Sequence, residues 1–427
     1  MREMKHSHVP WIGDIPVDWE VRKVKFLAKR ISKGNGITKD EVSPDGDMPC
    51  VRYGEIYTKY NNSFTECVSA TRIEIHSSPQ YVYKGDILLA GTGELVEEIG
   101  KGIVYLGEEK CIAGGDIILL TPICNSLFLN YALNSSYAQA QKSHNKAKLK
   151  VVHISPSEIG SIQIAVPSEC EQLRIAHLLD AKCAEIDSIL EQAQASIEEY
   201  KKLKQSFITE AVTKGIRGER PMKDSGVEWI GAIPADWDVM KIKWLLKERN
   251  DRSEEGYEEP LSMSQKFGII PTKDMDMVPN MASSFVGAKL VYRGDLVFNK
   301  LKAHLGVFAV SEYEGLVSPD YAVYYSAGRC DVKYLERIFK TPQYISEFRK
   351  RSTGVGAGLT RLYTSDLFDM YTALPSETEQ KEISAYLDDK CATIASLIAS
   401  KEALITELEA YKKSLIYEYV SGKKEVI

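Results

Sequence analysis

The feature that most constrains this chain is that its sequence is written twice. Residues 4–27 and residues 222–245 are identical at 15 of 24 positions. A second shared block begins at Pro167 and returns at Pro375, in the same order along the chain. Two ordered blocks of this kind indicate an internal duplication, in which each copy folds as the same supersecondary frame.

Between the shared blocks the two halves diverge. Residues 28–166 and 246–374 have little visible likeness, apart from a short trace in which Val82–Asp86 matches Val291–Asp295 as a turn leading into a strand. Each half therefore consists of shared blocks, which we call the frame, on either side of a divergent segment, which we call the middle. A duplicated frame favours one type of partner bound twice, and divergent middles favour two different targets.

A long helix is predicted after each middle. From about residue 169 to residue 213, proline and glycine are absent and apolar residues recur at alternating steps of four and three. A seam of this period, kept over several heptads, is typical of a coiled coil rather than of an ordinary surface helix. The seam includes Leu179, Ile186, Leu190 and Ile197 in the first copy and Leu387, Ile394, Ile398 and Ile405 in the second.

The direction of the two helices follows from the reach of the linker between them. A helix of about 45 residues is about 65 Å long at ~1.5 Å per residue. The linker from Lys214 to Glu228 spans at most about 50 Å when fully extended, so it cannot return the chain to the start of the first helix. The sequence therefore predicts an antiparallel pair, with one globular middle at each end.

The predicted fold class is α/β (α+β), with two globular recognition domains joined by a long antiparallel two-helix coiled coil and a pseudo-twofold internal repeat. We place the first domain at residues 1–168, the first spacer helix at 169–215, the second domain at 216–376 and the second spacer helix at 377–427. Short apolar runs bounded by turns predict strands in both middles, among them 86–90, 116–120 and 320–325.

The formal net charge of −6 argues against a surface that is basic throughout. A lone DNA-binding protein usually carries a basic surplus, because neutralising phosphates supplies most of its affinity. A DNA-binding function therefore requires that the positive charge is local, or that partner subunits supply much of the phosphate contact. Basic residues do cluster late in each middle, although a charge run is most often only a solvated face.

These clusters supply the candidate DNA-binding residues. They are Lys142, Asn145, Lys146, Lys148 and Lys150 in the first half, and Arg349, Lys350, Arg351 and Arg361 in the second. Further candidates are Arg52, Gln265, Lys266, Lys300 and Lys302. Lysines are expected mainly to hold phosphates, whereas arginine, asparagine and glutamine side chains are suited to reading base edges.

No sequence pattern indicates a catalytic, cofactor or metal site. The eight cysteines form no Cys-x-x-Cys pair and no histidine pair has zinc-ligand spacing, so we expect reduced thiols and no metal. Gly91 and Gly93 lack the spacing of a dinucleotide loop, and no P-loop is present. The Asn/Asp-Pro-Pro-Tyr/Phe motif of adenine methyltransferases is absent, and His153 near Ser155 has no third partner for a hydrolase triad.

The hydropathy pattern favours a cytoplasmic protein. No apolar run approaches the ~20 residues that a membrane span needs. The first residues also lack the apolar stretch of a signal peptide. We therefore expect no membrane partner.

The motifs of the frame resemble those of the specificity (S) subunits of type I restriction-modification systems. The resemblance lies in Trp11-Ile12-Gly13 with Asp18-Trp19 and their copy from Trp229 to Trp237, in the helix starts at Pro167–Gln172 and Pro375–Gln380, and in the helix exit at Glu210–Gly215. It implies two target-recognition domains, at residues 28–166 and 246–374. Each would read one half of a split, asymmetric site in double-stranded DNA.

The same resemblance implies the partners. Two methyltransferase (M) subunits would dock on the helical frame, and restriction (R) subunits would join them for cleavage. The chain itself would be non-catalytic and would hold no cofactor. S-adenosylmethionine would be bound by the M subunit, and N6-methyladenine would be the product of modification.

Two other interpretations stay open. A DNA-independent scaffold, with two interaction modules held apart by a coiled coil, is supported by the net acidity. The reader of a modification-only defence system would keep the same mechanism and change the partners. Basic residues of both middles facing one shared concave side would separate a DNA reader from a scaffold.

Overall fold

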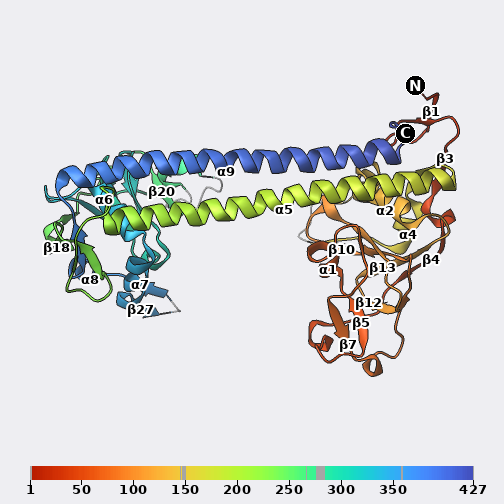
Figure 1. Ribbon diagram of the computed structural model, residues 1–427, viewed down its shortest axis with the longest axis horizontal. Coiled ribbons are helices and arrows are strands. Elements are labelled where there is room, and N and C mark those ends of the chain that lie inside the picture. Colours follow the sequence, from red (N-terminus) through yellow and green to blue (C-terminus); the bar gives the residue numbers. More distant parts are fainter. Residues whose placement is uncertain are drawn as a thin grey trace. The chain divides into compact units, whose positions relative to one another are not determined.

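The computed structural model describes residues 2–144, 146, 151–265, 267–275, 284–356 and 359–426. The chain divides into two compact units, one formed by Met1–Gln194 with Glu402–Ile427 and the other by Ala195–Lys401. Two long helices, α5 (Glu169–Lys214) and α9 (Glu377–Val420), each run from one unit into the other (Figure 1). Each unit therefore contains one of the divergent middles and half of both helices.

The first unit is built around a mixed sheet of five strands. Its order is β4-β13-β9-β11-β6, formed by Ala28–Lys33, Ile117–Pro122, Ile87–Ala90, Gly102–Tyr105 and Ser63–Phe64. A second sheet has the order β7-β5-β12-β8, formed by Ser69–Thr71, Met48–Val51, Cys111–Ala113 and Tyr81–Val82. The helices α2 (Ser126–Asn134) and α3 (Ser136–Ser143) follow β13.

Strand β9 shows why the apolar runs of this middle are continuous rather than alternating. Successive side chains of a strand point to opposite faces of the sheet. Ile87 and Leu89 pack into the core that contains α2, whereas Leu88 and Ala90 pack into the core shared with the second sheet. Both faces are covered, so every position is apolar.

The second unit repeats this order without repeating the sequence. Its sheet is β19-β26-β23-β24, formed by Leu246–Arg249, Tyr321–Ser326, Leu296–Asn299 and Phe308–Val310. The helices α6 (Val332–Phe339) and α7 (Pro342–Arg351) follow β26, as α2 and α3 follow β13. Three two-stranded sheets complete this middle: β20 with β21 (Leu261–Ser264, Gly268–Pro271), β22 with β25 (Lys289–Val291, Gly315–Val317) and β27 with β28 (Thr353–Gly356, Leu359–Arg361).

The blocks that repeat in the sequence form the same small strand pairs in both units. A hairpin opens each half: β1 with β2 (Met4–His6, Asp14–Pro16) and β16 with β17 (Met222–Asp224, Ala232–Pro234). The next strand pairs with the strand just before the long helix: β3 with β15 (Glu20–Lys23, Gln163–Val166) and β18 with β29 (Asp238–Lys241, Tyr371–Leu374). These pairs close each middle into a domain.

The long helices are antiparallel within each unit. In the first unit, Leu179 and Ile186 from the beginning of α5 share a core with Leu415 from the end of α9. In the second, Val212 from the end of α5 shares a core with Leu387 from the beginning of α9. The predicted class, two mixed α/β domains joined by long antiparallel helices, is confirmed.

One ion pair helps to fix the register of the two helices along this hydrophobic seam. The Lys412 ammonium lies 2.5 and 2.7 Å from the two carboxylate oxygens of Asp187 on the facing helix of the first unit. Of the remaining predicted seam residues, Ile197 and Ile394 are buried, and Leu190, Ile398 and Ile405 are half-buried.

The second long helix is shorter than the sequence predicts. It ends at Val420, and residues 421–426 turn back, so the expected helix at 377–427 has to be shortened at its end. Gly422 has φ +73°, and a Cβ there would lie 2.4 Å from Pro16 and 3.3 Å from Trp19. A glycine is required because the chain reverses against the opening hairpin at this point.

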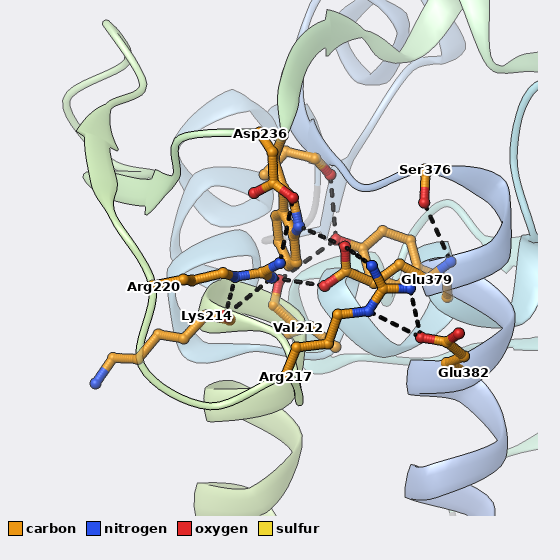
Figure 2. Close-up of polar contacts among 11 residues, drawn as sticks. Val212, Lys214, Arg217, Arg220, Asp236, Ser376, Glu379 and Glu382 are labelled. Atoms are coloured by element: carbon orange, nitrogen blue, oxygen red, sulfur yellow. Dashed lines mark hydrogen bonds and ion pairs between the residues drawn. The ribbon is translucent and has the colours of Figure 1, made fainter.

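A buried glutamate in the first turn of α9 fastens this helix to its domain. The Glu379 carboxylate is 1% exposed and accepts hydrogen bonds from Trp237 Nε1 at 3.1 Å and Arg220 Nη2 at 2.6 Å. Arg220 also donates to the backbone carbonyl of Lys214, the last residue of α5, at 3.1 Å (Figure 2). One guanidinium therefore joins the end of one helix to the beginning of the other. We call Arg220, Trp237 and Glu379 the second clasp.

The first unit contains the same arrangement. Glu171 in the first turn of α5 accepts hydrogen bonds from Trp19 Nε1 at 3.1 Å and Arg2 Nη1 at 2.5 Å. We call Arg2, Trp19 and Glu171 the first clasp. The repeat in the sequence begins two residues earlier than residues 4 and 222, because Arg2 and Arg220 hold the same place ahead of it.

The glutamine after each clasp glutamate ties the helix to its middle. Gln172 donates to the Pro167 carbonyl at 3.0 Å and accepts from the Asn125 amide, beside the start of α2, at 3.1 Å. Gln380 makes the equivalent bonds to Pro375 at 2.8 Å and Asp331 at 2.7 Å. The recurring Glu-Gln pair is thus explained by contacts inside each unit.

We predict that replacing Glu379 with glutamine destabilises the second unit by about 3 kcal/mol. The substitution leaves the Arg220 charge nearly buried without its partner, and breaking such a pair on one side is costly. Glu382→Gln is the matched control, because Glu382 binds Arg217 on the surface, where loss of an ion pair costs less than about 1 kcal/mol. Hydrogen exchange of residues 371–374 measures both effects. Equal protection in the two variants would contradict the prediction.

Candidate nucleic-acid interface

In the second domain, elements that carry several of the predicted DNA-binding residues meet at one loop, residues 300–306. This loop follows β23 and contains the 3-10 helix η7 (Ala303–Leu305), against which α7 packs. Gln265 Nε2 donates to the Leu305 carbonyl at 3.1 Å. The Lys300 carbonyl accepts from the Leu362 amide at 3.0 Å, just after β28. Segments distant in sequence therefore meet here, and we call this region the 300–306 cluster.

The cations of the 300–306 cluster differ in whether they already contact an acidic side chain. Lys302 and Arg349 are exposed. Lys350 and Arg351 contact the same carboxylate, Glu347, at 2.7 and 3.4 Å. A polyanion approaching α7 would meet two side chains that already share one acidic partner.

The deeper part of the 300–306 cluster carries excess positive charge. Burial, then the nearby charges of Lys289 and Arg361, lower the pKa of Lys300. Arg361 donates from Nη2 to Asp320 at 2.8 Å, while its buried Nε has no hydrogen-bond partner among the described residues. An anion bound beside Lys300 would relieve this mutual repulsion.

The first domain does not present its described candidates as one basic run. Lys142 is 2% exposed, and its ammonium donates to the Gly100 carbonyl at 2.6 Å. Burial lowers the pKa of Lys142 to about 7. Helix α3 packs toward the 3-10 turn Val96–Glu98, which places this side chain inside the domain. We therefore leave Lys142 out of the proposed interface.

The other candidates of the first domain lie on separate elements. Lys146 donates to the His153 carbonyl and to Glu158, both at 2.7 Å. Arg52 precedes α1 (Tyr53–Thr58) and pairs with Glu55 at 2.9 Å. Four candidates lie outside the described residues: Asn145, Lys148, Lys150 and Lys266.

A hollow of about 270 Å³ lies next to Lys146, between β4, β10 (Thr92–Gly93), β14 (Val152–His153) and α4 (Pro156–Ser161). Its rim includes Lys33 and Asp116, which sequence reasoning had not selected. His153 Nδ1 lies 3.0 Å from Thr92 Oγ1, whereas Ser155 caps α4. These separate partners give His153 and Ser155 structural roles.

The basic runs of the two halves begin in the last turns of equivalent helices. Lys142 lies in the last turn of α3, and Arg349 lies in the last turn of α7. Each helix is the second one after the six-residue strand of its sheet. The divergent sequences thus place basic residues at the same point of one topology, although Lys142 is buried.

The described residues contain no group of three or more histidine, cysteine, aspartate or glutamate side chains placed to hold a metal ion. All eight cysteines are free thiols. In the part of the chain that the structure describes, no helix combines the length and apolarity needed to cross a membrane.

The sequence is similar to one family along much of its first half. The model of the type I restriction modification DNA specificity domain matches residues 16–199. Two proteins of Methanocaldococcus jannaschii match over 237 residues, or 54% of this chain, at 29% and 26% identity, and the second is the type I restriction enzyme MjaVIII specificity subunit. The type I restriction enzyme EcoDI specificity subunit of Escherichia coli is 21% identical over 87% of this chain and 81% of its own length.

In sequence and in fold, the chain is similar to the specificity subunits of type I restriction-modification systems. It spans about half the length of the two archaeal relatives that it matches.

Solved structures share the fold of this chain. A chain from a study of complex assembly and conformational transition in a type I system has a TM-score of 0.71, with 13% identity, over 96% of this chain and 99% of its own. The HsdS subunit from Thermoanaerobacter tengcongensis has a TM-score of 0.53, with 13% identity, over 96% and 98%. The likeness is one of fold.

We predict a pH dependence in the first unit that comes from Lys142. Its folded pKa of about 7 lies below the ordinary value of about 10.4, so between these values the unfolded chain binds one more proton. The free energy of unfolding should therefore rise with pH across this window, by up to about 1.4 kcal/mol per pH unit. Below pH 7 the destabilisation is complete.

Lys142→Met should remove this contribution. Urea denaturation of both proteins from pH 7 to pH 10, with unfolding of the first unit followed by pulsed hydrogen exchange in residues 117–138, measures the difference. An identical pH slope in the wild type and the variant would show that Lys142 is not neutral in the folded state.

Proposed function

We propose that this chain is the specificity subunit of a type I restriction-modification complex and reads a two-part DNA target for it. Each domain reads one half of a split, asymmetric site. Neither domain performs chemistry, and the chain carries no cofactor of its own. Base edges and the shape of the duplex provide the sequence information, while lysine contacts to phosphate fix the position of each domain.

The observation that carries this proposal is one topology built twice from different sequences. The sheets β4-β13-β9-β11 and β19-β26-β23-β24 have equivalent strand orders, and the same hairpin and clasp precede and follow them. The residues that differ are those of the middles. A protein that reads two unlike half-sites with two copies of one partner needs this combination.

The partners proposed for the complex follow from the family and from the charge. Two methyltransferase subunits dock on the duplicated frame and bind S-adenosylmethionine, and restriction subunits join through them. A chain with a net charge of −6 gains little affinity for DNA from its charge alone. Basic partner subunits would supply the remaining phosphate contacts.

We predict that deleting the gene removes one split, gapped adenine-methylated motif from the DNA of the host. Replacing residues 28–166 with the corresponding segment of a relative should change one half of this motif and leave the other half intact, because each middle reads its own half-site. Methylation-aware sequencing of the three strains measures both results.

Two outcomes would contradict the proposal. A methylation pattern unchanged by the deletion, in a host whose methyltransferase subunit is shown to be active, would favour the DNA-independent scaffold that the net acidity supports. A change in both halves of the motif after replacement of one middle would contradict independent reading by the two domains.

We predict that Lys302→Glu and Arg349→Glu each weaken DNA binding by the assembled complex by about 10-fold or more. Both side chains are exposed in the 300–306 cluster, and each substitution replaces attraction to phosphate by repulsion. Lys333→Glu in α6 is the matched control, since Lys333 is exposed in the same domain and pairs with Glu312. Fluorescence anisotropy at two salt concentrations measures the affinity. Equal losses in all three variants would indicate a general charge effect.

A further inference from the structure

Two aromatic rings project from the frame at the same position of the repeat. Phe26 is 61% exposed and Trp244 is 59% exposed. Both residues fall within the block that is identical at 15 of 24 positions, and each is preceded by lysine and followed by leucine. A single exposed apolar side chain needs no explanation, but an exposed ring kept at the equivalent position of both copies indicates a shared use.

The backbone holds both rings in the same way. Phe26 ends the 3-10 helix η1 (Val24–Phe26), and Trp244 ends η5 (Ile242–Trp244). The first amide of η1 donates to the Ile162 carbonyl, and the first amide of η5 donates to the Met370 carbonyl, each at 2.9 Å. The aliphatic residues that flank each ring in the sequence are buried, namely Val24, Leu27, Ile242 and Leu245. The backbone that carries each ring is thus held against its domain, and the ring itself is exposed to solvent.

One lysine lies beside each ring, and a second follows it in the sequence. The ammonium of Lys25 lies 4.9 Å from the centre of the Phe26 ring, and that of Lys243 lies 5.2 Å from the Trp244 ring. Exposed lysines follow three positions later in both copies, Lys29 and Lys247. An aromatic anchor with a cation beside it complements an apolar pocket with an acidic rim.

The occupant is a protein rather than the DNA duplex. Phosphates offer no apolar surface, and the bases of an intact duplex are stacked, so an exposed ring would gain little from it. Equivalent chemistry in both copies requires one kind of partner bound twice.

We propose that Phe26 with Lys25, and Trp244 with Lys243, are two equivalent docking points for two copies of one partner protein. Each ring enters an apolar pocket rimmed by aspartate and glutamate. The inference rests on the proposed function, in which this partner is the methyltransferase subunit. It assigns the frame a contact that neither the long helices nor the divergent middles provide.

The test compares complexes of the full chain with purified methyltransferase subunit, using sedimentation and titration calorimetry. Phe26→Ala and Trp244→Ala should each weaken one of two equivalent sites by about 10-fold or more, and the double variant should weaken both. The exchange variants Phe26→Trp and Trp244→Phe should bind as the wild type does, because each copy already tolerates the residue of the other. Tyr257→Ala is the control, since Tyr257 is 86% exposed and lies outside the duplicated frame.

The outcomes separate this inference from the proposed function. If the wild type binds no methyltransferase subunit, the proposed function fails with it. If the wild type binds two copies and the alanine variants bind them equally well, the docking inference is overturned and the proposed function stands. Alanine variants that assemble normally but bind DNA more weakly at every sequence would assign the rings to DNA and would also overturn the inference.

Discussion

A buried carboxylate in the first turn of each long helix is the interaction on which the fold depends. Glu171 and Glu379 lie where the helix dipole favours negative charge, but burying a carboxylate is costly unless it is paired. An arginine and a tryptophan indole satisfy it in each unit. Since these donors come from the segment that opens the same half, the direction in which a helix leaves its domain is fixed together with the closure of that domain.

This dependence explains why the frame kept its sequence after duplication while the middles did not. A clasp needs one arginine, one tryptophan and one glutamate at fixed positions, and few other residues satisfy the same geometry. The sheets need only apolar side chains on both faces, which many sequences supply. Strands β9 and β23 pair in equivalent positions with different residues, yet Asp86 and Asp295 still accept the amide of the residue three positions earlier, at 2.9 and 3.0 Å.

The sequence predicts the parts of this fold that repeat at short range. The seam of α5 and α9 follows from its period, and β9, β13 and β26 follow from apolar runs after a turn. The candidate interface could be predicted only in outline, because it depends on tertiary contacts. Nothing local indicates that Lys142 lies inside its domain, or that Lys300 and Arg361, 61 positions apart in the chain, come near enough for their charges to interact. The clasps do leave a signal in the sequence, since Arg2 and Arg220 extend the repeat by two residues.

The charges of the proposed interface would suit discrimination better than tight binding. Lys146, Lys350 and Arg361 each contact a carboxylate in the free chain: Glu158, Glu347 and Asp320. A phosphate must displace these partners, so binding to arbitrary DNA, which is almost wholly electrostatic, gains little. Binding to the correct half-site adds contacts to base edges, which do not depend on the same charges. In the proposed complex, carboxylates beside the cations would therefore lower the affinity for every sequence while preserving the difference between the right sequence and the wrong ones. The remaining affinity would have to come from the partner subunits.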